Sequence, residues 1–198
     1  CALPICKRPD EARGAIVAVL PRHGRFSRKM AGNTTDEQVV AANIDVVFIV
    51  MALDADFSLR RFERYLLLAR ESGADPVVLL TKPDLSGEVP ARVAEVEALA
   101  AGAPVHVISP KFNQGLEHVA GFLTPGRTAA LLGSSGVGKT TIINRLVGED
   151  VRKTREVRAA DSKGRHTTTH RELVVLPGGA LIIDTPGMRE LQLWDVGE

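Results

Sequence analysis

The residues with the most distinctive chemistry lie in the segment 133–140, whose sequence is GSSGVGKT. The segment fits G-x-x-x-x-G-K-[ST], and it joins an apolar run at residues 129–132 to a helical pattern at residues 140–147. In that setting glycines let successive backbone N–H groups point at a phosphate, and the helix dipole attracts the same negative charge. The pattern therefore predicts a phosphate loop, against the alternative of a glycine-rich turn with a solvated lysine. Its predicted binding residues are Gly133, Ser134, Ser135, Gly136, Val137, Gly138, Lys139, Thr140 and Thr141.

Two side chains of this loop have specific roles in such a site. Lys139 is expected to reach the β- and γ-phosphates, and it therefore counts among the predicted catalytic residues. The hydroxyl of Thr140 is expected to bind Mg²⁺. A phosphate loop does not by itself select a base, so a base-reading motif must lie elsewhere in the chain.

Two further motifs follow apolar runs. The segment 81–84, TKPD, fits [NT]-K-x-D, in which the Asp84 carboxylate can accept the N1–H and N2–H₂ donors of guanine. Adenine offers no such donor pair, so Thr81, Lys82 and Asp84 favour GTP, with the Lys82 stem packing along the base. The segment 184–187, DTPG, places Asp184 to hold Mg²⁺ and the Gly187 N–H to meet the γ-phosphate. An ordinary turn explains either motif alone, but three motifs at strand ends together predict a GTP site.

Apolar runs and amphipathic segments alternate along the chain and define the elements that must position these motifs. The runs are continuous blocks such as VVFIV, VVLL and AALL, which is typical of strands buried on both faces. They predict strands at residues 15–20, 46–51, 77–81, 105–109, 129–132, 173–176 and 181–184. Helices are predicted within residues 58–72, with Ser58 as the cap, and at 89–101, 116–123 and 140–147. The alternation predicts an α/β fold of the P-loop NTPase class, with a mostly parallel sheet and helices on both faces.

The first 43 residues differ from the rest. They contain one clear strand, GAIVAVL, followed by a stretch that is first basic and then polar. We predict that residues 1–43 form the end of a separate β-rich module and a linker. Residues 44–198 are predicted to form the nucleotide-binding domain, because they contain all three motifs.

The composition argues against several classes of protein. The chain has 198 residues, 44% of them hydrophobic, and a formal net charge of +1, which suits a full core and not a histone-like nucleic-acid binder. The apolar run at residues 46–53 is too short to span a bilayer, and charges near the start interrupt any signal peptide. Only two cysteines, Cys1 and Cys6, are present, which favours a reducing, cytoplasmic setting without a membrane.

The order of the motifs is unusual, because the guanine motif precedes the phosphate loop and DTPG comes last. Most GTPases begin with the phosphate loop, so the chain is predicted to be a circularly permuted GTPase. This order, together with GSSGVGKTT, GRHTTTHREL and ANIDVVFIVMALDADFSLRRFERYL, resembles the RsgA/YjeQ family, GTPases of small-ribosomal-subunit assembly. The resemblance runs from about residue 15 to the end. It implies that residues 1–43 hold a short β remnant of an OB-fold, since family members begin with one.

The resemblance also implies roles in the segment 164–170, GRHTTTH, which lies where the first switch belongs. Thr168 is the residue implied to close on Mg²⁺ and the γ-phosphate, with Thr167 as the next candidate. Thr140 and Asp184 are the other predicted metal ligands. Met188 stands where many GTPases place a water-orienting glutamine. His166 is therefore the implied catalytic group for the water.

A second guanine-contacting loop is implied at residues 109–111, where this sequence has Ser-Pro-Lys and the family usually has Ser-Ala. A backbone N–H in that loop normally contacts the guanine carbonyl, and Pro110 has no N–H to give. Ser109 and Lys111 are therefore the expected contacts. We expect weakened base discrimination at most, because Asp84 keeps the main readout.

Positive charge is concentrated in two segments of the chain. Residues 1–43 carry a net charge of +3 and residues 152–171 a net charge of +5, which leaves the remainder acidic. The charged side chains are Arg22, Arg25, Arg28 and Lys29, beside the aromatic Phe26, and Arg152, Lys153, Arg155, Arg158, Lys163 and Arg165. Solvated loops are the usual explanation of such runs. With the family resemblance, we predict contact with the rRNA of the small ribosomal subunit.

The predicted function is hydrolysis of GTP to GDP and phosphate with Mg²⁺, by a monomeric factor in small-subunit maturation that the subunit stimulates. Zinc is expected only in the family's C-terminal domain, outside this sequence. Two alternatives are a permuted GTPase of large-subunit assembly and a nucleotide-gated RNA-binding module with incidental hydrolysis. A transporter-type ATPase would need an acidic residue directly after Asp184, where Thr185 stands.

Overall fold

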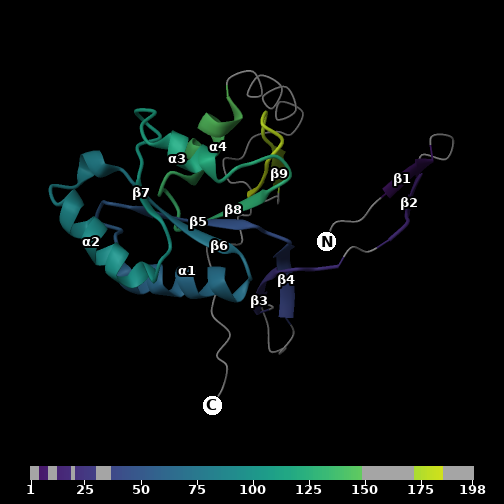
Figure 1. The fold of residues 1–198 in the computed structure, drawn as a ribbon, viewed down its shortest axis with the longest axis horizontal. Helices are drawn as coiled ribbons and strands as arrows, with labels where there is room; N and C mark the ends of the chain where they lie inside the picture. Colours follow the sequence, from purple (N-terminus) through teal and green to yellow (C-terminus); the bar gives the residue numbers. More distant parts are fainter. Residues whose placement is uncertain (1–4, 9–12, 19–20, 30–36, 149–171, 185–198) are drawn as a thin grey trace, which may run out of the picture.

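A six-stranded sheet forms the centre of the computed structural model, which describes residues 5–8, 13–18, 21–29, 37–148 and 172–184 (Figure 1). The strand order is β7-β6-β5-β8-β10-β9. The strands are β5 (Val46–Ala52), β6 (Asp75–Thr81), β7 (Val105–Val107), β8 (Thr128–Leu132), β9 (Glu172–Val175) and β10 (Leu181–Asp184). Neighbouring strands are parallel except β9 and β10, which are antiparallel. The predicted α/β fold with a mostly parallel sheet is confirmed.

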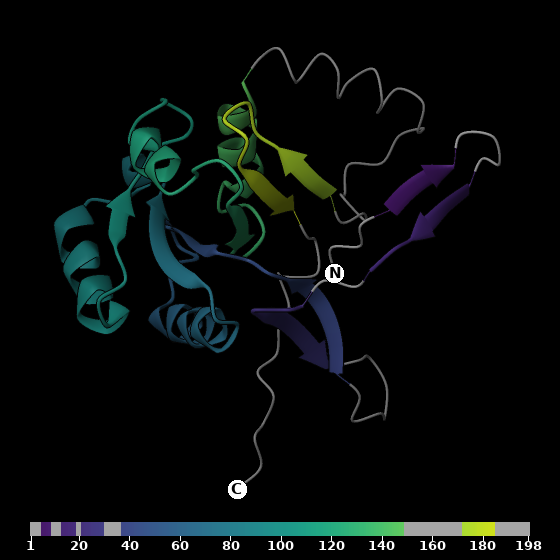
Figure 2. The ribbon, with the colours of Figure 1, turned by 45° about the vertical axis from the view of Figure 1, so that its right-hand side comes forward.

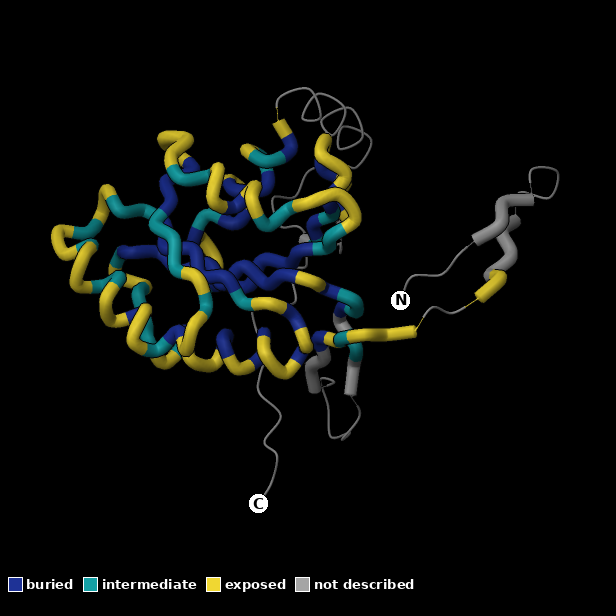
Figure 3. The backbone as a smooth tube through the Cα atoms, viewed as in Figure 1, coloured by how far each residue is buried: buried dark blue, intermediate teal, exposed yellow. Residues whose placement is uncertain are grey.

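Helices cover both faces of this sheet (Figure 1). The helices α1 (Leu59–Glu71) and α2 (Val89–Ala100) pack on one face, and α3 (Leu116–Gly121) and α4 (Lys139–Val147) pack on the other. Every residue of β5 is buried as a result, which explains its unbroken apolar sequence (Figure 3). Among the described helices, none has the length and apolar character needed to cross a membrane.

The predicted element boundaries in this domain hold to within two residues, because local signals set them. The helix α1 begins after Ser58, whose hydroxyl accepts a hydrogen bond from the Arg61 N–H at 3.4 Å, as a capping residue does. Its buried side chains, Phe62, Tyr65, Leu66, Leu68 and Ala69, lie along the face that packs on the sheet. The strand predicted at residues 105–109 is shorter than expected, since β7 ends at Val107 and Ser109 forms a separate bridge with Gln114.

The N-terminal residues contain more strands than the one predicted at residues 15–20. Two separate antiparallel hairpins are present (Figure 2). One pairs β1 (Ile5–Arg8) with β2 (Arg13–Ile16), and the other pairs β3 (Arg25–Lys29) with β4 (Glu37–Ala42). The predicted strand is therefore wrong in its bounds, because β2 ends at Ile16 and the following Val17 is 64% exposed.

The hairpin β3–β4 corrects a second expectation, because β3 lies in the stretch predicted to be a linker. Phe26 is only 2% exposed and packs with Ala41 in the buried cluster that also holds Phe62 of α1. The Phe26 ring is thus part of the core and is not available to stack on a nucleotide base. The sequence pattern did not predict this strand, because β3 has one large apolar residue among four polar ones. The domain boundary after residue 43 stays a prediction.

Candidate nucleotide-binding site

The segment 133–138 joins the end of β8 to the start of α4, as the sequence predicts. A side chain at Gly133 would collide with the carbonyl oxygen of Val50 in the neighbouring strand β5, so this position requires glycine. Gly138 has a φ of +104° directly before the helix, a value that L side chains rarely adopt. The Lys139 side chain is 8% exposed, and its Nζ atom donates to the carbonyl oxygens of Gly133 and Ser134. Two carbonyl groups of the loop backbone therefore hold the Lys139 ammonium group in position.

Thr81 connects this loop to the TKPD segment. The residue is 1% exposed at the end of β6, and its hydroxyl lies 2.7 Å from the carbonyl oxygen of Val137 and 3.2 Å from that of Met51. The contact with Val137 crosses β5, which pairs with β6 on one side and with β8 on the other. Two motifs that are distant in sequence are thus joined by a buried hydrogen bond.

A cavity of about 530 Å³ opens beside this contact. This volume is within the range of small-molecule sites. Nine of the predicted site residues line it, namely Thr81, Lys82, Asp84, Ser109, Lys111, Gly136, Val137, Gly138 and Thr141. Leu85, Pro110 and Arg145 complete the lining. The cavity lining does not include five other predicted residues of the same loop and the first turn of α4, namely Gly133, Ser134, Ser135, Lys139 and Thr140.

The loop at residues 109–111 is held in place by α4. Ser109 is 3% exposed, and its backbone N–H and carbonyl bond to Gln114 across a tight turn. Arg145 of α4 donates from Nε to the carbonyl oxygen of Pro110 at 3.0 Å and from Nη2 to that of Lys111 at 3.3 Å. The sequence did not indicate Arg145 as a site residue, because no local pattern reveals a contact 35 positions away.

Lys82 is positioned by an ion pair from the loop that follows β5. Its Nζ lies 2.8 Å from Oδ2 of Asp54, and its backbone has a φ of +56° in the left-handed region. The hydrogen bond from Lys82 and a second one from the backbone N–H of Asp56 hold the pKa of the Asp54 carboxyl below its usual range. Asp54 is therefore anionic at neutral pH and pairs with the lysine beside the cavity. Sequence reasoning missed Asp54.

Two of the predicted magnesium ligands, Asp184 and Thr140, belong to elements that meet at the adjoining edge of the sheet. The strand β10 ends at Asp184 and runs parallel to β8, which leads into the phosphate loop, so both carboxyl ends lie at the same edge. Thr140 is exposed in the first turn of α4, where its hydroxyl can reach a ligand of that loop. Carboxylate and hydroxyl oxygens suit Mg²⁺, and the placement fits the predicted site. Within the described residues, no cluster of three or more His, Cys, Asp or Glu side chains is arranged for a metal.

The remaining predicted site residues lie outside the described residues. They are His166 and Thr168 of the predicted switch and Gly187 of the DTPG segment. Their roles stay predictions that rest on the sequence.

Comparisons with known proteins agree with this arrangement. The family model described as RsgA GTPase matches residues 19–194. A curated relative from Opitutus terrae, named small ribosomal subunit biogenesis GTPase RsgA, is 55% identical over 185 residues, which are 93% of this chain and 50% of the relative. Another of that name, from Syntrophotalea carbinolica, is 48% identical, over 96% of this chain and 54% of its own. The chain thus spans about half the length of the curated relatives it matches.

Solved structures show the same fold. YjeQ from Thermotoga maritima superposes with a TM-score of 0.67 at 26% identity, covering 93% of this chain and 59% of that one. YloQ, described as a circularly permuted GTPase, superposes with a TM-score of 0.62 at 21% identity, covering 98% and 58%. The order observed here, with the TKPD segment on β6 before the phosphate loop after β8, is the order predicted for such a permutation. The chain therefore belongs to the RsgA GTPase family and has the fold of a circularly permuted GTPase.

Proposed function

We propose that this chain binds GTP with Mg²⁺ and hydrolyses it to GDP and inorganic phosphate, as a maturation factor of the small ribosomal subunit. The contact between Thr81 and Val137 carries the proposal, because it joins the TKPD segment to the phosphate loop beside a cavity of about 530 Å³. The family supports the reaction, and the relatives' name supports the partner. A cytoplasmic monomer acting at the subunit is the proposed setting.

In the proposed reaction, a water oxygen attacks the γ-phosphorus while the bond to the β–γ bridging oxygen breaks. GDP leaves, and the water oxygen becomes part of the inorganic phosphate. Lys139 offsets the charge that develops on the β- and γ-phosphate oxygens, from a position fixed by the carbonyls of Gly133 and Ser134. Thr140, Thr168 and Asp184 would hold Mg²⁺, which would supply further positive charge near the phosphates. His166 orients the water, and Asp84 selects guanine.

Hydrolysis is tested by steady-state release of phosphate from GTP and from ATP, with Lys139→Met as the matched blank. Methionine keeps the length and volume of the buried lysine stem and removes its charge. We expect turnover of GTP by the parent chain, with both ATP turnover and the variant near background. Equal release from GTP and ATP, or full activity of Lys139→Met, would refute the proposed site.

The subunit partner is tested by sedimentation with purified small or large ribosomal subunits. The chain is incubated with GDP or with a non-hydrolysable GTP analogue at increasing salt. We expect binding to the small subunit in the analogue-bound form, with a steep loss as salt rises, because phosphate contacts release counterions. Preferential binding to the large subunit would instead support the alternative role in large-subunit assembly.

A further inference from the structure

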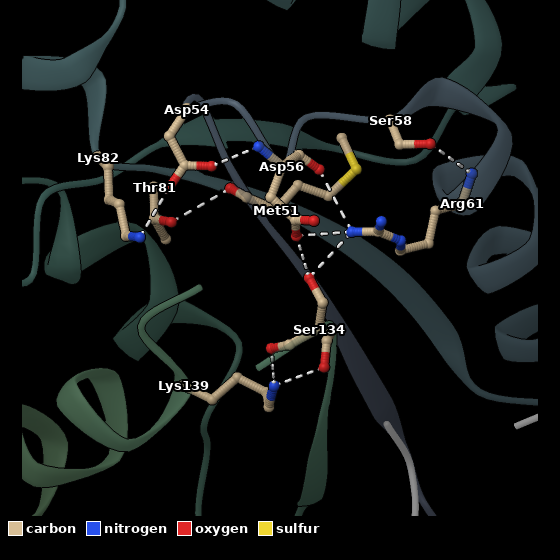
Figure 4. A network of polar contacts seen from close by, with 10 residues as sticks. Met51, Asp54, Asp56, Ser58, Arg61, Thr81, Lys82, Ser134 and Lys139 are labelled. Carbon is tan, nitrogen blue, oxygen red and sulfur yellow. Dashed lines mark hydrogen bonds and ion pairs between the residues drawn. The ribbon is translucent and has the colours of Figure 1, made fainter. Parts of the chain in front are cut away.

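The loop between β5 and α1, residues 53–58, lies between the two parts of the nucleotide site. Its position follows from the sheet order, because β5 pairs in parallel with both β6 and β8. The carboxyl end of β5 therefore emerges between the TKPD segment and the phosphate loop. Figure 4 shows two carboxylates of this loop, Asp54 and Asp56, in contact with opposite parts of the site. The mechanism described above uses neither of them.

Asp54 contacts the base end of the site. Its Oδ2 accepts from Lys82 Nζ at 2.8 Å, and its Oδ1 accepts from the backbone N–H of Asp56 at 2.9 Å. The second bond sets the conformation of the loop, since it closes a turn around the two aspartates. The Asp54 carboxylate is thereby held against the backbone of Asp56.

Asp56 contacts the phosphate end. Its Oδ2 accepts from the Ser134 hydroxyl and, at 2.6 Å, from Nη1 of Arg61 in the first turn of α1. The same Nη1 lies 3.1 Å from the Ser134 hydroxyl oxygen, so the three side chains form a closed triangle (Figure 4). Hydrogen bonds from Ser134 and Arg61 hold the pKa of the Asp56 carboxyl below its usual range, and it is anionic at neutral pH.

Ser134 faces this triangle and Lys139 at once. Its hydroxyl bonds to Asp56, while its carbonyl oxygen accepts from Lys139 Nζ. A loop that contains Gly133, Gly136 and Gly138 has few side chains with which to fix its backbone. The Asp56–Arg61 pair therefore contacts the hydroxyl of Ser134, and the carbonyl oxygen of Ser134 contacts Lys139. Ser134 thus links α1 to the lysine that is proposed to bind the phosphates.

We propose, on the basis of the GTP site proposed above, that Asp56 and Arg61 are positioning residues for the phosphate loop, and that Asp54 does the same for the base end. The side chains of Arg61 and Asp56 are 29% and 45% exposed. Ion pairs this exposed contribute little to folding stability. The pair is expected to act on the affinity for the phosphates, and thermal stability should change little.

The test compares GMP with GDP, because only GDP carries the β-phosphate that Lys139 binds. Affinities are measured by competition against a fluorescent GDP, and thermal melting is followed in parallel. In Asp56→Asn and in Ser134→Ala, we expect GDP affinity to fall by about tenfold, because the loop is less well preorganised for the β-phosphate, while GMP affinity stays within about twofold. In Asp54→Asn, affinity for both nucleotides should fall by the same factor, because the base end is shared.

Four further variants separate positioning from a general structural effect. Arg61→Ala should lower GDP affinity like Asp56→Asn, and Arg61→Lys should restore part of it by keeping the charge. Arg64→Ala, an exposed arginine on the same helix, should leave both affinities unchanged. The double variant Asp56→Asn with Ser134→Ala should lose no more than either single variant, since both remove one contact.

Parallel losses for GMP and GDP in Asp56→Asn, or parent-like GDP affinity in both Asp56→Asn and Ser134→Ala, would overturn the inference. If Asp56→Asn fails to fold, the Ser134→Ala variant tests the same role, because it removes the hydrogen bond between Ser134 and Asp56 by changing the donor. A parent chain that binds GDP no better than GMP would instead refute the proposed nucleotide site. The two failures are therefore distinguishable.

Discussion

The hydroxyl of Thr81 lies 2.7 Å from the carbonyl oxygen of Val137, a residue 56 positions further along the chain. This buried contact connects the segment proposed to read the base with the loop proposed to hold the phosphates. The TKPD segment is a weak indication of a GTP site by itself, and its contact with the phosphate loop strengthens that indication. The contact also explains why a threonine serves at the first position of the TKPD segment, since its hydroxyl supplies the donor.

Replacing Thr81 with valine should weaken both folding and nucleotide binding. Valine keeps the shape of the side chain but leaves the Val137 carbonyl without its donor, at a cost of about 1–3 kcal/mol in the free energy of unfolding. Denaturant unfolding and GDP titration measure the two effects. Thr81→Ser, which keeps the hydroxyl, should retain most of the GDP affinity. If Thr81→Val binds GDP as tightly as the parent, the contact has no role in the site.

Replacing Asp84 with asparagine should change the base that the site prefers. The asparagine amide offers a donor where xanthine has a carbonyl and guanine has an amino group. We expect GTP affinity to fall by about a hundredfold or more and xanthosine triphosphate to bind better than GTP. Asp75→Asn, at an exposed ion pair with Arg127, is the matched control. Unchanged preference for GTP would show that another residue reads the base, and inosine triphosphate tests whether the parent uses the 2-amino group.

Replacing His166 with alanine should reduce hydrolysis more than binding. His166 lies outside the described residues, and its role follows from the GRHTTTH segment and from Met188 in the usual glutamine position. General acid–base catalysis typically raises the rate of the chemical step by about 10²- to 10⁴-fold. Single-turnover hydrolysis and GDP titration separate the two effects. A variant that hydrolyses GTP at the parent rate would remove the assignment.

The histidine pair of β7 and α3 should make stability fall as the pH drops below about 6.5. His106 stacks on His118 at 4.8 Å between ring centroids, and within the described residues its buried Nε2 has no hydrogen-bond partner. Burial, with a smaller contribution from His118, lowers the pKa of His106 below the usual histidine value of about 6.5. The unfolded chain therefore takes up the proton first, and the stability present above pH 6.5 is lost as the pH falls toward the folded-state pKa.

Unfolding free energies measured from pH 7.5 to pH 5 would show this effect as a slope. His106→Gln should flatten the slope, whereas His23→Gln, at an exposed position, should leave it unchanged. If His106→Gln leaves the slope of the unfolding free energy unchanged, a group other than His106 causes the pH dependence.

The strands and helices of the central domain were predictable because their signals are local. Blocks such as VVFIV indicate burial on both faces, and Ser58 before an amphipathic stretch indicates a helix start. The strand β3 was not predictable in this way, because Phe26 is the one large apolar residue in its sequence and its partner strand begins only at Glu37. Its charged neighbours gave the segment the composition of a linker.

The site was predictable where a motif lies on one loop and not where it depends on sheet order. The phosphate loop and the TKPD segment each carry a local pattern, so most of the cavity lining was expected. Asp54, Asp56 and Arg61 enter the site only because β5 lies between β6 and β8. Strand order cannot be read from apolar runs, and the contacts that depend on it therefore required the structure.

The central claim is tested most directly by GTP turnover measured for the chain alone, with purified small subunits and with purified large subunits, using Lys139→Met as the blank. We predict that small subunits raise the turnover of the parent chain, that large subunits do not, and that the blank stays at background in all three conditions. Equal stimulation by both subunits, or stimulation by the large subunit alone, would contradict the proposed function.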